Sequence, residues 1–71
     1  MDYDYSKLKG KIREVYGTQD AFANAVGMGK TSLSFKLNNK SEWTQEEMTR
    51  AMDLLNIPHK SVRTYFFTHK Y

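Results

Sequence analysis

Residues 18–38, TQDAFANAVGMGKTSLSFKLN, decide the fold of this chain, because they predict two short helices joined by a tight turn. Thr18 can cap the first helix, since its hydroxyl oxygen can accept a hydrogen bond from a backbone N–H that the helix leaves unpaired. Gly27 ends that helix, because a residue with a Cβ enters the left-handed backbone conformation only at a cost. The second helix is expected to begin near Lys30.

The spacing of apolar side chains separates an inner from an outer face on both helices. Phe22 and Val26 are four residues apart and share one face of the first helix, as Leu33 and Leu37 do on the second. The outer side of the second helix is left with small polar residues and one aromatic residue: Thr31, Ser34, Phe35 and Asn38. This pattern is typical of a helix-turn-helix, whose second helix lies in the major groove of DNA.

The motif predicts a set of DNA contacts. Gln19, at the start of the first helix, can donate its side-chain amide to a phosphate; the alternative is a solvated residue at a helix start. Lys30 and Thr31 open the second helix, where side chains approach base edges; lysine suits guanine and threonine offers a hydroxyl or a methyl group. The remaining candidates continue along the same side to the edge of the groove: Ser34, Asn38, Asn39 and Lys40.

Phe35 does not fit a simple two-helix core, because it points away from Leu33 and Leu37 on a helical wheel. Three interpretations remain open. The ring can contact a thymine methyl group, pack in the core or under the loop before Trp43, or form part of a protein interface.

The spacing of Gln19, Ala23, Gly27 and Leu33 resembles the DNA-binding domains of lambda-type Cro and CI repressors. The runs KLNNK (36–40) and YFF (65–67) resemble those of Cro-like early regulators of Gram-positive temperate phages, among them the "modulator of repression" proteins. The resemblance covers the whole chain. It implies a lambda-repressor-like fold and a role in the switch between lysogenic and lytic transcription.

Two positions depart from the pattern of that family. Phe35 stands where the family often has a polar residue that reads bases, and Asn39 replaces the usual glycine. Asn38 and Asn39 both tolerate a left-handed backbone, so they still suit the exit from the second helix.

Three further helices are expected, one before the motif and two after it. Asp4 can cap a first helix over residues 5–16, which Gly17 ends. Its apolar stripe comprises Tyr5, Leu8, Ile12, Val15 and Tyr16. Thr44 and Glu47 form a capping box, T-x-x-E, for a helix that continues to Asn56, with Trp43 and Met48 as a hydrophobic staple.

Pro58 suits the first turn of a fifth helix over residues 58–67, with Val62, Tyr65 and Phe66 pointing inward. The tail YFFTHKY (65–71) favours the end of this helix. It can alternatively form a strand that pairs with its copy in a homodimer, as in some Cro proteins. The sequence therefore predicts an all-α fold of five short helices in a single domain over residues 1–71.

The distribution of charged residues is compatible with a protein that binds DNA. The net charge is +3, and the excess lies in residues 1–41, which hold seven basic and four acidic side chains. A basic half is the expected footprint of phosphate binding, although solvated lysines give the same pattern.

The sequence offers little for metal binding or catalysis. There is no cysteine, and His59 and His69 have no partners at metal-ligand spacing. We expect no metal, no cofactor and no catalysis. No apolar run is long enough for a signal peptide or membrane span, so we expect a cytoplasmic protein of the bacterial host.

Two hypotheses of function from different classes follow. The leading one is a phage transcriptional regulator that binds double-stranded operator DNA through residues 30–38. The rival, implied by the resemblance to modulators of repression, is an antirepressor that binds the phage CI repressor, with Phe35 in the interface. An antitoxin is a third and weaker interpretation.

Overall fold

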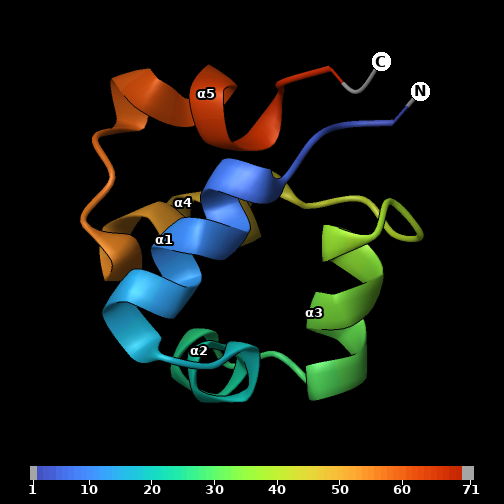
Figure 1. Ribbon diagram of the computed structural model, residues 1–71, viewed down its shortest axis with the longest axis vertical. Helices are drawn as coiled ribbons and strands as arrows, with labels where there is room; N and C mark the ends of the chain where they lie inside the picture. The colour runs from blue at the N-terminus through green and yellow to red at the C-terminus, as the bar shows by residue number, and fades with distance from the viewer. Residues whose placement is uncertain (1, 70–71) are drawn as a thin grey trace.

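The computed structural model describes residues 2–69, and this part of the chain is helical (Figure 1). The five α-helices are α1 (Ser6–Tyr16), α2 (Gln19–Val26), α3 (Lys30–Leu37), α4 (Gln45–Leu55) and α5 (Val62–Phe66). A short 3-10 helix, His59–Ser61, precedes α5. The predicted all-α fold of five short helices is thereby confirmed. None of these helices has the length and apolar character needed to cross a membrane.

Most of the predicted helix ends in the first half of the chain are confirmed, but α1 begins at Ser6 with Tyr5, rather than Asp4, at the N-cap position. Gly17 ends α1 with φ +83°, and Gly27 ends α2 in the left-handed conformation with φ +77°. The Thr18 hydroxyl accepts a hydrogen bond from the backbone N–H of Ala21 at 3.1 Å, which caps α2. The helix α3 begins at Lys30, as the sequence predicts. These local signals therefore place α2 and α3 on either side of a three-residue turn.

The fourth helix has the expected capping box, whereas the fifth is shorter than expected. The Thr44 hydroxyl accepts from the N–H of Glu47, and the Glu47 carboxylate accepts from the N–H of Thr44. Pro58 precedes a 3-10 turn closed by the bond from the N–H of Ser61 to the Pro58 carbonyl oxygen at 2.8 Å. Because this turn takes up the first residues, α5 starts only at Val62 and ends at Phe66.

The core is one cluster of apolar side chains to which every α-helix contributes. The buried members are Tyr5, Leu8, Ile12, Phe22, Ala23, Val26, Leu33, Leu37, Ala51, Met52, Leu55, Ile57 and Phe66. Trp43, partly buried, packs edge-on against Phe66 with the ring centroids 5.0 Å apart. No cysteine or charged residue contributes to the cluster, so burial of apolar surface stabilises the domain.

Val15 corrects the predicted stripe of α1, because its side chain is 41% exposed. The next residue, Tyr16, takes the inward position instead. Its ring lies 5.4 Å from that of Phe22, and its hydroxyl donates to the carbonyl oxygen of Leu54 at 3.5 Å. Four residues after Ile12, Tyr16 lies almost above it on the helix, whereas Val15 lies on the other side of the stripe.

The two ends of the described chain lie side by side (Figure 1). Tyr3 and His69 form a single antiparallel bridge, and the N–H of Asp4 donates to the carbonyl oxygen of Thr68 at 2.7 Å. The sequence predicts that the fifth helix continues to residue 67, but α5 ends at Phe66. The extended residues that follow pair with the chain's own N-terminal segment. Lys70 and Tyr71, the last residues of the YFFTHKY tail, lie outside the described residues.

Candidate binding face on α3

The candidate binding face is the outer side of α3, which runs along one side of the molecule (Figure 1). Leu33 and Leu37 point inward and are buried, with 1% and 2% of their surface exposed. Lys30, Thr31, Phe35 and Asn38 are exposed, and Ser34 is half-buried. The structure thus brings these predicted site residues together on one helix, as their spacing requires.

Two polar side chains on this face are bonded to each other. The side-chain amide of Asn38 donates to the carbonyl oxygen of Ser34 at 2.8 Å and to the Ser34 hydroxyl oxygen at 3.4 Å. A base-reading role requires free donors and acceptors at the outer side of the helix. The Asn38 amide would have to turn away from Ser34 to supply them.

The positive charges near α3 are largely matched by carboxylates. The ammonium of Lys30 lies 3.4 Å from the carboxylate of Asp20, and both side chains are mostly exposed. The ammonium of Lys36 lies 3.4 Å from the carboxylate of Glu47 and donates to the carbonyl oxygen of Glu42. Among the described residues, Lys40 is the cation of this stretch for which the structure shows no ion pair. The α3 face is therefore weakly charged.

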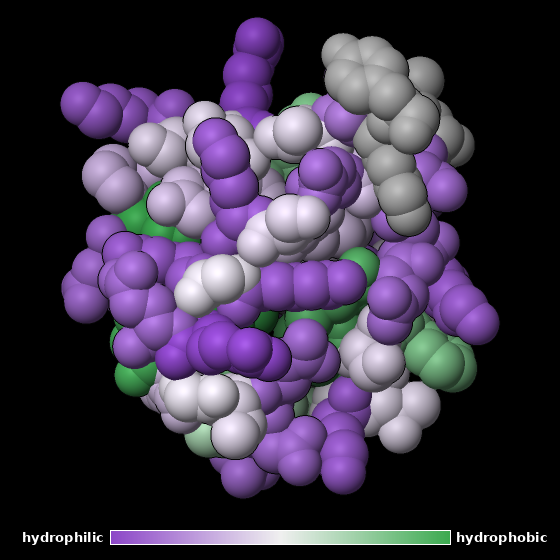
Figure 2. Space-filling view, viewed as in Figure 1, coloured by the Kyte–Doolittle hydropathy of each residue, from purple (hydrophilic) through white to green (hydrophobic). Residues whose placement is uncertain are grey.

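Phe35 is the large apolar side chain of this face, with 45% of its surface exposed. Phe35 is not among the buried residues of the core, which excludes the interpretation of Phe35 as a core residue. On the face shown in Figure 2, hydrophilic side chains predominate, and a small apolar area lies at the outer edge of α3.

Asn39, a predicted DNA contact at the edge of the groove, bonds to the N-terminal segment of the chain. Its backbone is left-handed, with φ +63°. Its side-chain amide donates to the carbonyl oxygen of Tyr3, and its side-chain oxygen accepts from the N–H of Tyr3, both at 2.9 Å. The side chain is therefore occupied by the N-terminal segment. The two consecutive asparagines in the sequence indicated a left-handed backbone after α3, but no nearby residue indicated that Asn39 would bond to Tyr3.

Gln19 lies exposed at the start of α2, beside a hollow of about 490 Å³ between α1 and α2. Lys9 and Arg13 line the same hollow, and neither forms an ion pair with a described residue. Sequence reasoning missed this basic pair. Its signal is the spacing of four residues, which places both cations on one side of α1.

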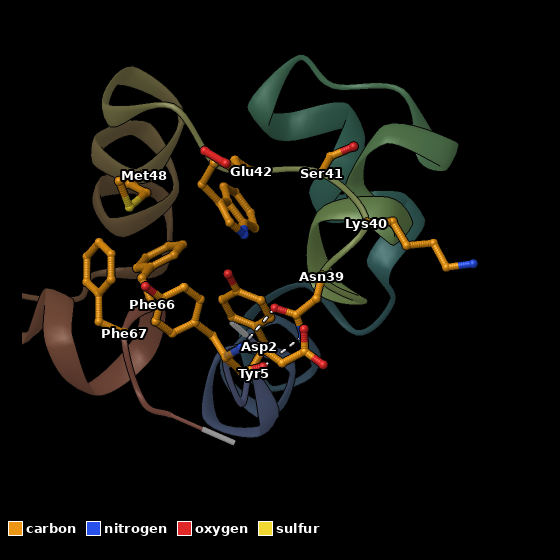
Figure 3. A pocket seen from close by; sticks show the side chains of 11 residues that line it. Asp2, Tyr5, Asn39, Lys40, Ser41, Glu42, Met48, Phe66 and Phe67 are labelled. Carbon is orange, nitrogen blue, oxygen red and sulfur yellow. Dashed lines mark hydrogen bonds between the residues drawn. The ribbon is translucent and has the colours of Figure 1, made fainter. Parts of the chain in front are cut away.

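A second hollow, of about 570 Å³, lies between the N-terminal segment, the loop after α3 and α5 (Figure 3). Aromatic side chains line much of it, and the ammonium of Lys40 points away from it.

Two residues that line this hollow have polar groups in a buried setting. Burial, together with the neighbouring Tyr3, raises the pKa of the Tyr5 hydroxyl above its usual value. The indole N–H of Trp43 is buried and forms no hydrogen bond within the described part of the chain. No group of three side chains in residues 2–69 could hold a metal ion.

Comparisons with known proteins agree with this architecture. A family described as "Protein of unknown function (DUF739)" matches residues 1–69, and the chain belongs to this family. A comparison with curated protein sequences found no match. The chain is similar to the solution structure of the modulator of repression (MOR) of the temperate bacteriophage TP901-1 from Lactococcus lactis. The two share 43% identity over 94% of this chain and 90% of the other, with a TM-score of 0.83.

Proposed function

We propose that this member of the DUF739 family is a regulator of repression in a temperate bacteriophage, and that it acts by binding the phage repressor protein through the outer face of α3. The similarity to a phage modulator of repression supports the first part. The observation that carries the second part is the exposure of Phe35 on the outer face of α3. Aromatic side chains are enriched at protein interfaces, where a few large residues supply most of the binding energy.

The charges and hydrogen bonds of this face favour a protein partner over DNA. Lys30 is paired with Asp20, and the Asn38 amide is bonded to Ser34. No arginine, the side chain most used for bidentate contacts to guanine, occurs in residues 30–38. A weakly charged surface with a central aromatic residue suits a polar protein surface better than a row of phosphates.

Operator DNA is the second candidate partner. Gln19, Lys30, Thr31 and Lys40 are all exposed, and Lys9 and Arg13 add two cations beside Gln19. Such a distribution can follow a phosphate backbone while α3 faces a groove. This alternative requires the pairs that Lys30 and Asn38 form to open on binding.

The substitution Phe35→Ala separates the two candidates. Phe35→Ala should weaken repressor binding by about 2 kcal/mol or more, as at an interface hot spot, while DNA binding falls only slightly. The repressor affinity is measured by calorimetry and the operator affinity by gel shift. Val15→Ala is the matched control, because Val15 is also an exposed apolar residue and lies on α1.

Thermal unfolding of both variants accompanies the binding assays, so that a loss of folding is not counted as a loss of contact. Unchanged repressor binding by folded Phe35→Ala protein would contradict the proposed docking face. A large loss of operator binding in the same variant would favour DNA as the partner.

A further inference from the structure

The side chain of Asn39 joins the end of α3 to the N-terminal segment of the chain. Its amide donates to the Tyr3 carbonyl oxygen and its oxygen accepts from the Tyr3 N–H, each at 2.9 Å and across 36 residues of sequence (Figure 3). A carboxamide carries a donor and an acceptor in the same arrangement as a peptide group. Asn39 therefore pairs with Tyr3 as an adjacent strand would.

Tyr3 is held in turn by the C-terminal segment. It bridges His69, and the following residue, Asp4, donates its N–H to the Thr68 carbonyl oxygen at 2.7 Å. The Tyr3 ring packs edge-on against Phe67 with the centroids 5.6 Å apart, and it lies 5.5 Å from the His69 ring. Three segments that are distant in sequence thus meet at Tyr3: the exit of α3, the N-terminal segment and the residues after α5.

The C-terminal end of α3 is held by buried Leu37 and, just beyond the helix, by the two bonds of Asn39 to this junction. Among the helices, α3 packs mainly against α2. Lys36, which pairs with Glu47, is a second tie near the C-terminal end of α3. Asn39 also lies only one residue beyond Asn38, the last residue of the candidate face.

We infer that Asn39 is a positioning residue for the α3 binding face and that the N-terminal and C-terminal segments set the orientation of that face through it. The inference rests on the proposed function only in that α3 is the binding face. The junction itself is a property of the fold. It predicts that changes at Tyr3, far from the outer side of α3, alter binding through α3.

The test replaces Asn39 by glycine and uses Asn56→Gly as the matched control. Both asparagines follow a helix and have left-handed backbones, with φ +63° and +57°, so glycine relieves rather than creates backbone strain at each. The structure shows no side-chain hydrogen bond from Asn56 to another described residue. Asn39→Gly thus removes the two bonds to Tyr3, and Asn56→Gly reproduces only the change of residue type.

Amide hydrogen exchange of the folded proteins is the first readout. In Asn39→Gly, the amides in the last turn of α3 should exchange about tenfold faster than in Asn56→Gly, the effect of losing two ordinary hydrogen bonds. The amides of α1 and α4 should exchange alike in the two variants. Equal exchange throughout α3 in the two variants would overturn the inference, whether or not the protein binds a repressor.

Binding to the phage's own repressor is the second readout, applied also to Tyr3→Ala. This variant loses the ring contacts with Phe67 and His69 but keeps its backbone atoms. Asn39→Gly should weaken repressor binding about tenfold, and Asn56→Gly should bind normally. Tyr3→Ala should also weaken binding, because the ring contacts that hold the partner of Asn39 in place are lost. If the parent protein binds no repressor, the proposed function fails and hydrogen exchange alone decides the inference. If it does bind and Asn39→Gly binds equally well, the inference is wrong and the proposed function stands.

Discussion

The ammonium of Lys36 lies 3.4 Å from the Oε1 atom of Glu47, and the same oxygen accepts the backbone N–H of Thr44 at 2.9 Å. Lys36 also donates to the carbonyl oxygen of Glu42 at 3.1 Å. One carboxylate therefore completes the cap of α4 and ties that helix to α3. The Lys36 side chain is only 12% exposed, so the pair is better shielded from water than the other ion pairs of the described residues.

The dual role of Glu47 predicts a graded response to substitution. Glu47→Gln keeps an oxygen that can accept from Thr44 and loses the charge facing Lys36, whereas Glu47→Ala loses both. We expect Glu47→Ala to lower the free energy of unfolding by about 1–2 kcal/mol, and Glu47→Gln by less. Urea unfolding followed by circular dichroism measures both, and a double-mutant cycle with Lys36→Met isolates the pair. A coupling energy of zero in this cycle would show that the two side chains do not stabilise each other.

The same carboxylate predicts a dependence of stability on pH. Burial raises the pKa of Glu47, but the hydrogen bond from Thr44 and the charge of Lys36 lower it more, so the pKa lies below its usual value. A carboxyl whose pKa is lower in the folded state stabilises the protein above its unfolded pKa, about 4.3. This contribution is lost as the pH falls through the lower folded pKa. The stability difference between the parent protein and Glu47→Gln should therefore be largest near neutral pH and shrink below about pH 4. A difference that stays constant from pH 7 to pH 3 would rule out this contribution.

Trp43 predicts a stability effect outside the binding face. Its ring packs against Phe66 and lies 6.5 Å from the ring of Tyr5. Trp43→Ala should lower the free energy of unfolding by about 3 kcal/mol, as for the truncation of a large aromatic side chain. Trp43→Phe should cost less, because it keeps an aromatic ring and removes a buried N–H that has no partner. Circular dichroism follows the unfolding, since these variants lack the chain's one tryptophan. Equal losses for the two variants would show that a smaller aromatic ring recovers none of the packing, and would contradict the stabilising role of the ring contact with Phe66.

The pairing of Lys30 with Asp20 predicts a gain in DNA binding on its removal, if DNA approaches α3. Asp20→Asn removes the carboxylate that lies 3.4 Å from the Lys30 ammonium. DNA affinity should then rise, and the slope of log affinity against log salt should steepen by up to about 0.9, the value for one added phosphate contact. Lys40→Ala should lower the affinity almost equally on any sequence. Fluorescence anisotropy at several salt concentrations measures both. No change in either variant would argue against operator DNA as the partner.

The sequence predicted the helices well because the signals that start and end them are local. Thr18, Gly27 and the Thr44–Glu47 box act within a few residues, and the structure confirms each of them. It was less successful at the end of the chain. There Pro58 starts a 3-10 turn rather than the α-helix itself, and the last described residues pair with the N-terminal segment.

The candidate face was predicted in part. Helical spacing alone placed Thr31, Ser34, Phe35 and Asn38 on the outer side of α3, because the period of a helix fixes which side chains share a face. It did not show which of them were free. The bonds from Asn38 to Ser34 and from Lys30 to Asp20 depend on side-chain conformations and on the approach of α2 to α3.

The sequence by itself thus determined the helices, their caps and the amphipathic faces, since these follow from interactions between residues at most a few positions apart. Only the tertiary structure decided what Asn39 and Lys36 contact, and that Val15 is exposed. Asn39 meets Tyr3 across 36 residues. Val15 is exposed because Tyr16 takes the inward position beside Phe22. Lys36 meets the cap of the following helix. Such contacts depend on how the helices pack, and spacing along the chain carries no information about the distance between segments that are far apart in sequence.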